Sequence, residues 1–265
     1  MTKLHQKTIW ITGASSGIGK SLALSLAAKK NTLILSSRNE QNLNSLKNEC
    51  EALGSSCYIA TLDLSDQGSI EKAAEDVLSK FEEIDLLINN GGISQRSFSE
   101  ETPLDVERKI MEINYFGQVI LTKKVLPVMI KRKQGQIAVT SSIVGIFGFP
   151  LRSTYSASKH ALHGYFETLK IEQKKNNIQV SLIIPGRIRT NISYNAVAKD
   201  GKSHGIMDEG QDKGMDPDKC ARKIIRSLEK NKYEILIGGK ELIMVFLRRN
   251  FKRLFFKLAS NIKST

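Results

Sequence analysis

TGASSGIG, residues 12–19, follows the apolar run TIWI (residues 8–11) and continues into a helical pattern at about residues 18–31. Glycines in such a loop let the backbone turn tightly and bring its N–H groups against a pyrophosphate, while the helix start adds the positive end of its dipole. A plain tight turn is the alternative, but the place between a first strand and a first helix favours a dinucleotide site. The predicted cofactor contacts here are Gly13, Ser15, Ser16, Gly17, Ile18 and Gly19.

The rest of the chain alternates short apolar runs with longer helical patterns. Strands are predicted at residues 8–11, 32–36, 58–63, 85–90, 136–141, 179–184 and 233–238. They lack strict alternation of apolar and polar residues, as expected when helices cover both faces of a parallel sheet. Helical patterns lie at about 18–31, 39–53, 66–81, 103–132, 155–175 and 216–230, and Asp216 before Pro217 is a helix-start signal.

This alternation predicts an α/β fold of the Rossmann type, doubly wound, with a seven-stranded, mostly parallel sheet and helices on both faces. The 265 residues contain no Pro/Gly/Ser-rich linker, so we expect one domain over residues 1–240 and an extension over residues 241–265. Residues 187–215 are polar, contain several glycines and match neither period, so a mobile lid is expected there.

The composition, 40% hydrophobic and 25% charged, is ordinary for a soluble protein. The net charge of +13 is compatible with nucleic acid, an anionic cofactor, an acidic partner protein or a membrane surface, and does not choose among them. Cys50, Cys57 and Cys220 have neither metal-ligand spacing nor a pairing pattern, so we expect reduced cysteines and no metal site. Because the first strand begins at Thr8, no signal peptide is expected, and the predicted location is cytoplasmic.

The second predicted strand ends in SSRN, residues 36–39. In dinucleotide folds an acidic side chain here binds the ribose of NAD, whereas an arginine accommodates the 2′-phosphate of NADP. Ser37 stands where the acid would be and Arg38 follows it, which favours NADP(H), with a solvated helix-start arginine as the alternative. Asp63, at the end of the third run and before Leu64, is predicted to contact the adenine amino group, or alternatively to cap the next helix.

Further motifs occur in one order along the chain: NNGG (89–92), Asn114, SSIVG (141–145), YSASK (155–159) and PGRIRT (185–190). Together with TGASSGIG they resemble the single-domain branch of the short-chain dehydrogenase/reductase family, over about residues 6–240. The family usually has alanine where this chain has Gly92, which should loosen the packing near the cofactor without removing any chemistry. The resemblance also implies a homodimer or homotetramer.

The resemblance implies roles for individual residues. Ser142 matches the serine that holds the substrate oxygen, Tyr155 the proton donor, and Lys159 its partner on the nicotinamide ribose. Asn114 matches the residue that links the lysine to a chain of waters. Further cofactor contacts are implied at Asn89, Asn90, Gly91, Pro185, Gly186, Ile188 and Thr190.

The chemistry explains why a tyrosine and a lysine stand four residues apart. A free tyrosine has a pKa of about 10, too high to cycle its proton easily near neutrality. Residues i and i+4 share a helix face, so the Lys159 cation is expected to favour the phenolate and lower the pKa of Tyr155. Ser142 can donate a hydrogen bond to a developing alkoxide. In an isolated helix, the same pair would be solvated surface residues.

The substrate is less well specified by the sequence. A mostly apolar pocket is predicted from the apolar residues that follow Ser142 and open the segment 187–215, with Ser94 and Gln95 as its few polar groups. The apolar residues are Ile143, Phe147, Phe149, Pro150, Ile188, Ile192 and Tyr194, although about half of them are expected to belong to the core instead. The predicted activity is the NADP(H)-dependent interconversion of a carbonyl and a secondary alcohol on a largely apolar small molecule. Alternatives are reduction of 3-oxoacyl groups on an acidic carrier protein, and an NADP(H)-binding sensor without chemistry. No nucleic-acid partner is expected.

The last stretch, residues 241–263, is both apolar and basic. Its apolar positions fall at spacings of three and four: Ile243, Leu247, Phe251, Leu254, Phe255, Leu258 and Ile262. Around them lie Arg248, Arg249, Lys252, Arg253 and Lys257. The longest apolar run, Leu242 to Leu247, is far short of the ~20 residues that span a bilayer. The pattern favours a helix whose apolar face packs on the enzyme's own core or on a second subunit. The alternative is a helix that lies on an anionic membrane, at the inner membrane surface.

Overall fold

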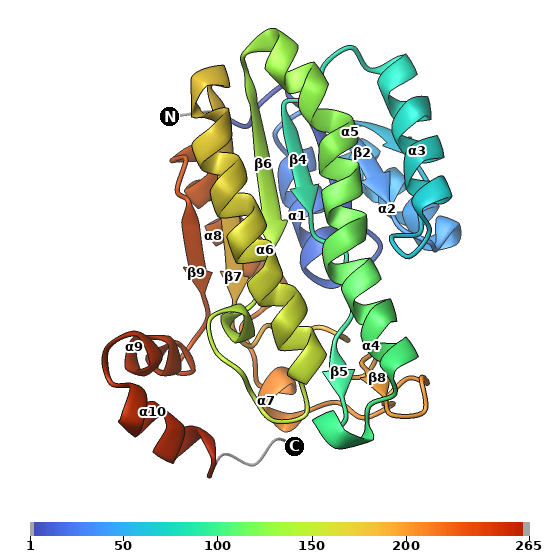
Figure 1. Cartoon of the computed structure of the whole chain (residues 1–265). Helices are drawn as coiled ribbons and strands as arrows, with labels where there is room; N and C mark the ends of the chain where they lie inside the picture. Colours follow the sequence, from blue (N-terminus) through green and yellow to red (C-terminus); the bar gives the residue numbers. More distant parts are fainter. Residues whose placement is uncertain (1–2, 262–265) are drawn as a thin grey trace.

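Within residues 3–261, which the computed structural model describes, seven strands form one sheet (Figure 1). They are β1 (Thr8–Thr12), β2 (Thr32–Ser36), β3 (Ser56–Ile59), β4 (Leu86–Asn89), β6 (Gly135–Thr140), β7 (Ile178–Pro185) and β9 (Glu234–Ile237). Their order is β3-β2-β1-β4-β6-β7-β9, and every neighbouring pair is parallel. The predicted doubly wound fold is confirmed. The chain order reverses between β1 and β4, where open α/β sheets bind their ligands.

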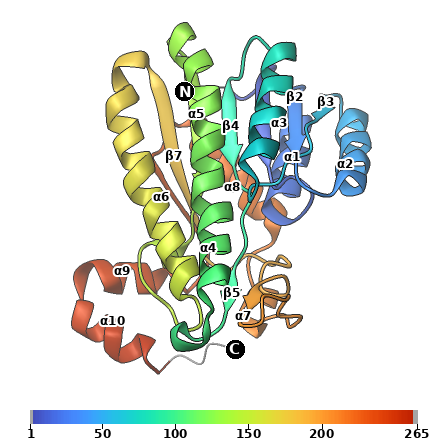
Figure 2. The same cartoon turned by 45° about the vertical axis from the view of Figure 1, so that its right-hand side comes forward.

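Helices cover both faces of the sheet (Figure 2). On one face lie α1 (Gly17–Ala27), α2 (Glu40–Ala52) and α8 (Pro217–Glu229), and on the other α3 (Gln67–Lys80), α5 (Gly117–Arg132) and α6 (Ser153–Glu172). Successive residues of one strand enter opposite layers: in β1, Ile9 and Ile11 pack in the first core and Trp10 in the second. Because both layers are apolar, the strands show no polar alternation.

The starts of α8 and α3 show which of the predicted N-cap residues cap a helix. Asp216 caps α8 by accepting hydrogen bonds from the backbone N–H groups of Asp218 and Lys219, as predicted. The third strand is shorter than predicted and ends at Ile59, so Asp63 lies in the loop that follows it. The cap of α3 is Asp66 rather than Asp63. The capping role considered for Asp63 is therefore wrong.

The helix predicted over residues 103–132 is divided into three parts. These are α4 (Leu104–Met111), a π-helical turn η2 (Glu112–Phe116) and α5. A π-helical turn leaves no mark in the apolar period, so the sequence pattern reads as one helix.

The segment 187–215 contains structure that the sequence did not predict. Its strand β8 (Val197–Ala198) pairs with β5 (Gln95–Arg96) in a second, parallel sheet, and α7 (Glu209–Asp212) follows. Ile188 and Met215 pair at its base. Elements of two to four residues are too short to show a period. The 3₁₀ turns η1 (Ser99–Glu101), η3 (Ile143–Gly145) and η4 (Gln173–Asn176) complete the described elements.

The C-terminal stretch forms two helices instead of the single predicted one. α9 (Leu242–Asn250) and α10 (Lys252–Ala259) meet at Phe251, whose φ of −134° and ψ of 64° are not helical. Ile262, the last member of the predicted apolar face, lies outside the described residues. Across residues 3–261, no helix is both long enough and apolar enough to cross a membrane.

Candidate active site

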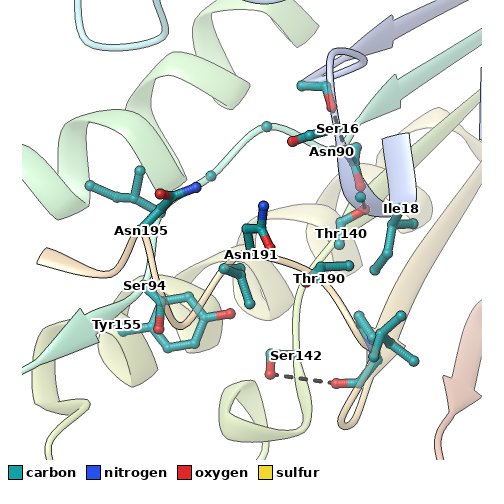
Figure 3. Close-up of a pocket in the computed structure, with 18 of the residues that line it drawn as sticks. Ser16, Ile18, Asn90, Ser94, Thr140, Ser142, Tyr155, Thr190, Asn191 and Asn195 are labelled. Carbon is teal, nitrogen blue, oxygen red and sulfur yellow. Dashed lines mark hydrogen bonds between the residues drawn. The ribbon is translucent and has the colours of Figure 1, made fainter. Parts of the chain in front are cut away.

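A cavity of about 1260 Å³ opens at the carboxyl ends of the strands. Its wall comes from the loops after β1, β2, β3, β4, β6 and β7, from the first turns of α6, from the segment 187–215 and from the start of α9. Pockets for one drug-sized ligand usually have roughly 300–1,000 Å³, so this cavity has room for a large ligand and a second molecule beside it. Figure 3 shows how side chains from several of these loops converge on it.

The glycine loop lies tightly against the loop that follows β4. Gly13 and Gly17 have φ angles of +61° and +54°, in the left-handed region that favours glycine. A methyl group on Gly13 would lie 2.7 Å from the Cα of Gly91, and one on Gly19 only 2.1 Å from the carbonyl oxygen of Gly13. The loop therefore needs glycine at these points, and it presents backbone N–H groups at the start of α1. Such a cradle suits an anionic group such as a pyrophosphate.

Ser37, Arg38 and Asp63 lie in the cavity wall beyond the end of β2. Arg38 is exposed and forms no hydrogen bond or ion pair with another described residue. Burial by itself would raise the pKa of Asp63, but two hydrogen bonds from Ser65 and the charges of Arg38 and Lys109 outweigh it and lower that pKa. An ionised carboxylate and an unpaired guanidinium thus stand together at this end of the cavity.

Most of the predicted site residues line the cavity. They are Gly13, Ser15, Ser16, Gly17, Ile18, Ser37, Arg38, Asp63, Leu64, Asn90, Gly91, Ser94, Ser142, Phe147, Tyr155, Lys159, Pro185, Gly186, Ile188, Thr190 and Ile192. Gly19, Asn89, Gln95 and Asn114 do not reach its wall. Gly19 instead provides the close packing described above.

Asn89 points away from the cavity. Its side chain is fully buried and donates a hydrogen bond to the hydroxyl of Thr122 in α5, at 2.8 Å. Side chains alternate between the two faces of a strand, so the next residue, Asn90, faces the glycine loop and the cavity. Both Asn89 and Asn90 were expected to contact the cofactor; only Asn90 lines the cavity, so the expectation for Asn89 is corrected.

Tyr155 in α6 and Ser142 after β6 meet in the cavity wall (Figure 3). The Ser142 hydroxyl donates to the carbonyl oxygen of Pro185 at 3.5 Å. Burial raises the pKa of Tyr155, while a hydrogen bond with Ser142 and the charges of Arg96 and Arg152 lower it in part. The net direction is upward, so the phenol carries its proton at neutral pH.

Lys159 does not act on Tyr155 in the way the sequence suggested. Its ammonium donates to the carbonyl oxygen of Thr140 at 2.7 Å and lies 5.8 Å from the centre of the Tyr155 ring. Burial lowers the pKa of Lys159 to about 7, so near neutral pH only part of the population carries the charge. The cations that lower the pKa of Tyr155 here are Arg96 and Arg152.

Asn114 lies behind Lys159, in the π-helical turn η2. Its amide accepts from the N–H of Ile93 at 2.8 Å and donates to the carbonyl of Ile93 and to the hydroxyl of Ser158. A methyl group on Gly92 would lie 3.0 Å from the Asn114 amide oxygen and 3.4 Å from the Lys159 nitrogen. Gly92, the second glycine of NNGG, therefore leaves space beside the side chains of Asn114 and Lys159.

Gln95 holds the start of α6 and does not contact the cavity. Its Oε1 accepts hydrogen bonds from the backbone N–H groups of Thr154 at 2.9 Å and Tyr155 at 3.1 Å. Its Nε2 donates to the hydroxyls of Ser97, Thr102 and Ser153. The N-cap residue of α6, Arg152, makes no side-chain cap, so Gln95 satisfies N–H groups that would otherwise be orphaned. The expectation that Gln95 lines a substrate pocket is corrected.

A partly buried charge cluster lies beside Tyr155, and the sequence did not predict it. Arg96 donates from Nε to Asp208 at 3.2 Å, and Arg152 donates from Nη2 to the same carboxylate at 2.9 Å. Two cations share one anion, and all three line the cavity. Asp208 lies 112 residues from Arg96 and 56 from Arg152, so no local spacing could have marked the cluster.

The C-terminal stretch also contributes to the wall, and its packing on the enzyme's own core is one of the two outcomes expected from its sequence. Glu241 and Met244 line the cavity, and Glu241 accepts a hydrogen bond from the N–H of Arg187 at 2.7 Å. Phe147 of the wall packs on Phe255 of α10, with ring centres 5.1 Å apart. The stretch is therefore part of the site.

The family described as short chain dehydrogenase matches the chain over residues 7–201. The chain belongs to the short-chain dehydrogenase/reductase family. This short-chain dehydrogenase is 40% identical, over 266 residues, to Dehydrogenase/reductase SDR family member 7B of Bos taurus, and the alignment covers 97% of this chain and 82% of that protein. Membership places it among oxidoreductases.

Solved structures of short-chain dehydrogenases share its fold. An alcohol dehydrogenase from the archaeon Thermococcus sibiricus, complexed with 5-hydroxy-NADP, is 25% identical, with a TM-score of 0.77 over 88% of this chain and 97% of that one. A short chain dehydrogenase/reductase from Burkholderia phymatum, in complex with NAD, is 23% identical, with a TM-score of 0.85 over 96% of both chains. Family members of this fold thus bind either nicotinamide nucleotide.

Proposed function

We propose that this short-chain dehydrogenase uses NADP(H) to interconvert a carbonyl and a secondary alcohol on a largely apolar small molecule. The observation that carries the proposal is one shared cavity: Ser142, Tyr155 and Lys159 line it together with the glycine loop and Arg38. A proton donor and a cradle for a phosphorylated dinucleotide on the same wall suit a reaction that moves a hydride and a proton.

The residues around the glycine loop fit an NADP cofactor. The loop would hold the pyrophosphate, Asp63 the adenine amino group and Lys159 the nicotinamide ribose. Arg38 would hold the 2′-phosphate, because its guanidinium is exposed, unpaired among the described residues and next to the uncharged Ser37. When bound, the nicotinamide supplies or takes up the hydride. The alcohol dehydrogenase bound to an NADP derivative supports this choice.

The proton would pass through Tyr155. In the reduction, the phenol donates its proton to the carbonyl oxygen while the carbon receives the hydride, and the Ser142 hydroxyl donates a hydrogen bond to the same oxygen. The raised pKa of Tyr155, caused mainly by burial, keeps the proton available at neutral pH. Arg96 and Arg152 then stabilise the phenolate that remains. Alcohol oxidation runs the same steps in reverse.

The substrate end of the cavity supports an apolar molecule. Phe147, Phe149, Ile192 and Met244 contribute apolar side chains to this wall. Polar groups also line it, among them Ser94, Ser142, Asn191, Asn195 and the Arg96–Arg152–Asp208 cluster. In such a pocket the apolar side chains provide contact area and the polar groups orient the ligand.

A panel of ketones and secondary alcohols, followed by the absorbance of NADPH and of NADH, tests the proposal. We expect turnover of apolar ketones with NADPH and much slower turnover with NADH. Tight binding of NADPH with no turnover of any member would instead indicate a sensor. Activity only on an acyl group carried by an acidic protein, falling steeply with salt, would indicate the carrier-protein reductase.

A further inference from the structure

Six large apolar side chains of the C-terminal helices face solvent. They are 41% to 61% exposed: Ile243, Phe246, Phe251, Leu254, Phe256 and Leu258. The other side of the two helices is buried, where Val245 and Phe255 pack with Phe147 and Tyr155. The helices are thus held to the protein by one side and present a second apolar side outward. Scattered exposed apolar residues are normal, but a contiguous patch marks an interaction site.

These six side chains, which we name the α9–α10 patch, are interspersed along the sequence with cations. The cations are Arg248, Arg249, Lys252, Arg253 and Lys257, and residues 242–261 contain no Asp or Glu. Among the described residues, only Arg249 has an acidic partner, Glu234 at 2.8 Å. The two helices therefore expose apolar side chains together with an excess of positive charge.

This charge distribution distinguishes between two possible occupants. A second copy of the chain, seated on the patch by a two-fold symmetric contact, would bring the cations of both copies together. An anionic lipid surface would neutralise them and would also take up the phenylalanine and leucine side chains at the boundary between headgroups and acyl chains. In charge and in apolar character, the patch is therefore complementary to an anionic lipid surface and not to the same patch on a second copy of the chain.

The position of the patch relates it to the cavity. Figures 1 and 2 show α9 and α10 projecting from the body at the end of the sheet where α7 and the short second sheet also lie. Met244, next to the exposed Ile243, lines the cavity, and Phe255, next to the exposed Phe256, packs on Phe147 in its wall. A surface that covers the patch therefore lies beside the cavity.

We infer that the α9–α10 patch docks on an anionic lipid surface and places the cavity wall beside the membrane. Lipid binding does not depend on the proposed reaction. If that reaction acts on apolar molecules, docking shortens their path, because such molecules concentrate in lipid.

The full chain is sedimented with vesicles of phosphatidylcholine alone and with vesicles that also contain phosphatidylglycerol. We expect binding to the anionic vesicles. Each cation near an anionic surface adds roughly a five-fold factor in partitioning, so Arg253→Gln/Lys257→Gln should weaken this binding about 25-fold. Phe246→Ser/Phe256→Ser should weaken it at least about ten-fold, because the removed rings no longer enter the lipid.

Matched control variants change the same chemistry elsewhere on the surface. Lys174→Gln/Lys175→Gln alters two exposed lysines of η4, at the far end of α6, and Leu53→Ser/Ile171→Ser alters two exposed apolar residues outside the patch. Both should bind like the wild type. The inference is overturned if the intact protein stays in the supernatant with anionic vesicles, or if the controls lose as much binding. It is also overturned if sedimentation velocity without lipid shows a dimer that Phe246→Ser/Phe256→Ser dissociates.

Discussion

Arg38 faces the cavity without a described partner, so its guanidinium is free to bind an anion. Arg38→Ala should weaken NADPH binding by about 1.5–3 kcal/mol, the contribution of hydrogen bonds to a charged group, and should leave NADH binding unchanged. Fluorescence titration of both cofactors measures the difference. Arg222→Ala, an exposed arginine of α8 outside the cavity wall, is the control and should change neither. Equal losses for NADPH and NADH would refute the phosphate contact.

Arg152 is one of the two cations that lower the pKa of Tyr155. In the proposed alcohol oxidation the Tyr155 phenolate would accept the proton, so the rate should rise with pH through that pKa. Arg152→Gln removes a charge that favours the phenolate, which raises the pKa and moves the midpoint of the pH profile to higher pH. The profile of kcat/KM for oxidation measures it, with the exposed Arg189→Gln as control. An unchanged midpoint would mean that Arg152 serves only to hold Asp208.

Single residues were predictable where a short motif carries their role. Gly13 and Tyr155 lie in the cavity as expected because a tight loop and a helix face are local features. The face that Asn89 takes depends on where β4 ends, and a shift of one residue exchanges it with Asn90. Asp208 pairs with residues far away in the chain, and only the folded structure brings them together.

The start of α6 is the element on which the position of Tyr155 depends. Gln95→Leu leaves the backbone N–H groups of Thr154 and Tyr155 without their acceptor, so it should cost about 1–3 kcal/mol of unfolding free energy. It should also lower kcat more than it changes NADPH affinity, because the glycine loop is untouched. Gln95→Glu keeps an acceptor for both groups and should restore much of both quantities. Urea unfolding and steady-state kinetics check this. Full stability in Gln95→Leu would contradict the capping role.

At the scale of elements, long periodic segments were predictable and short ones were not. The strand and helix patterns from residue 8 to 230 reappear in the structure because each buries a continuous apolar face. Single turns are set by tertiary contacts: η2 interrupts the long helix where Asn114 bonds Ile93, and β8 exists because β5 lies beside it. The break at Phe251 has the same origin, since α10 turns back to bury Phe255.

For the whole molecule, seven apolar runs and intervening helices led to the parallel sheet, and the sheet order places the motifs at one edge. The sequence could not show that the C-terminal stretch joins this edge. The spacing of its apolar residues predicts a single apolar face. In the structure, Glu241 and Phe255 pack inward, whereas Phe246 and Phe256 stay exposed. Helix periodicity shows which residues share one face of a helix, but it does not show which part of the protein that face packs against.

We propose that Tyr155 moves the proton in a cavity that also binds NADPH, and a comparison of two tyrosine variants can refute this role. Tyr155→Phe removes a hydroxyl and keeps the ring, while Tyr165→Phe makes the same change ten residues further along α6, outside the cavity wall. With the best ketone of the panel, Tyr155→Phe should bind NADPH like the wild type and lose turnover by at least about 10²–10⁴-fold, and Tyr165→Phe should lose neither. Turnover of Tyr155→Phe within a few-fold of the wild type would mean that Tyr155 is not the proton donor.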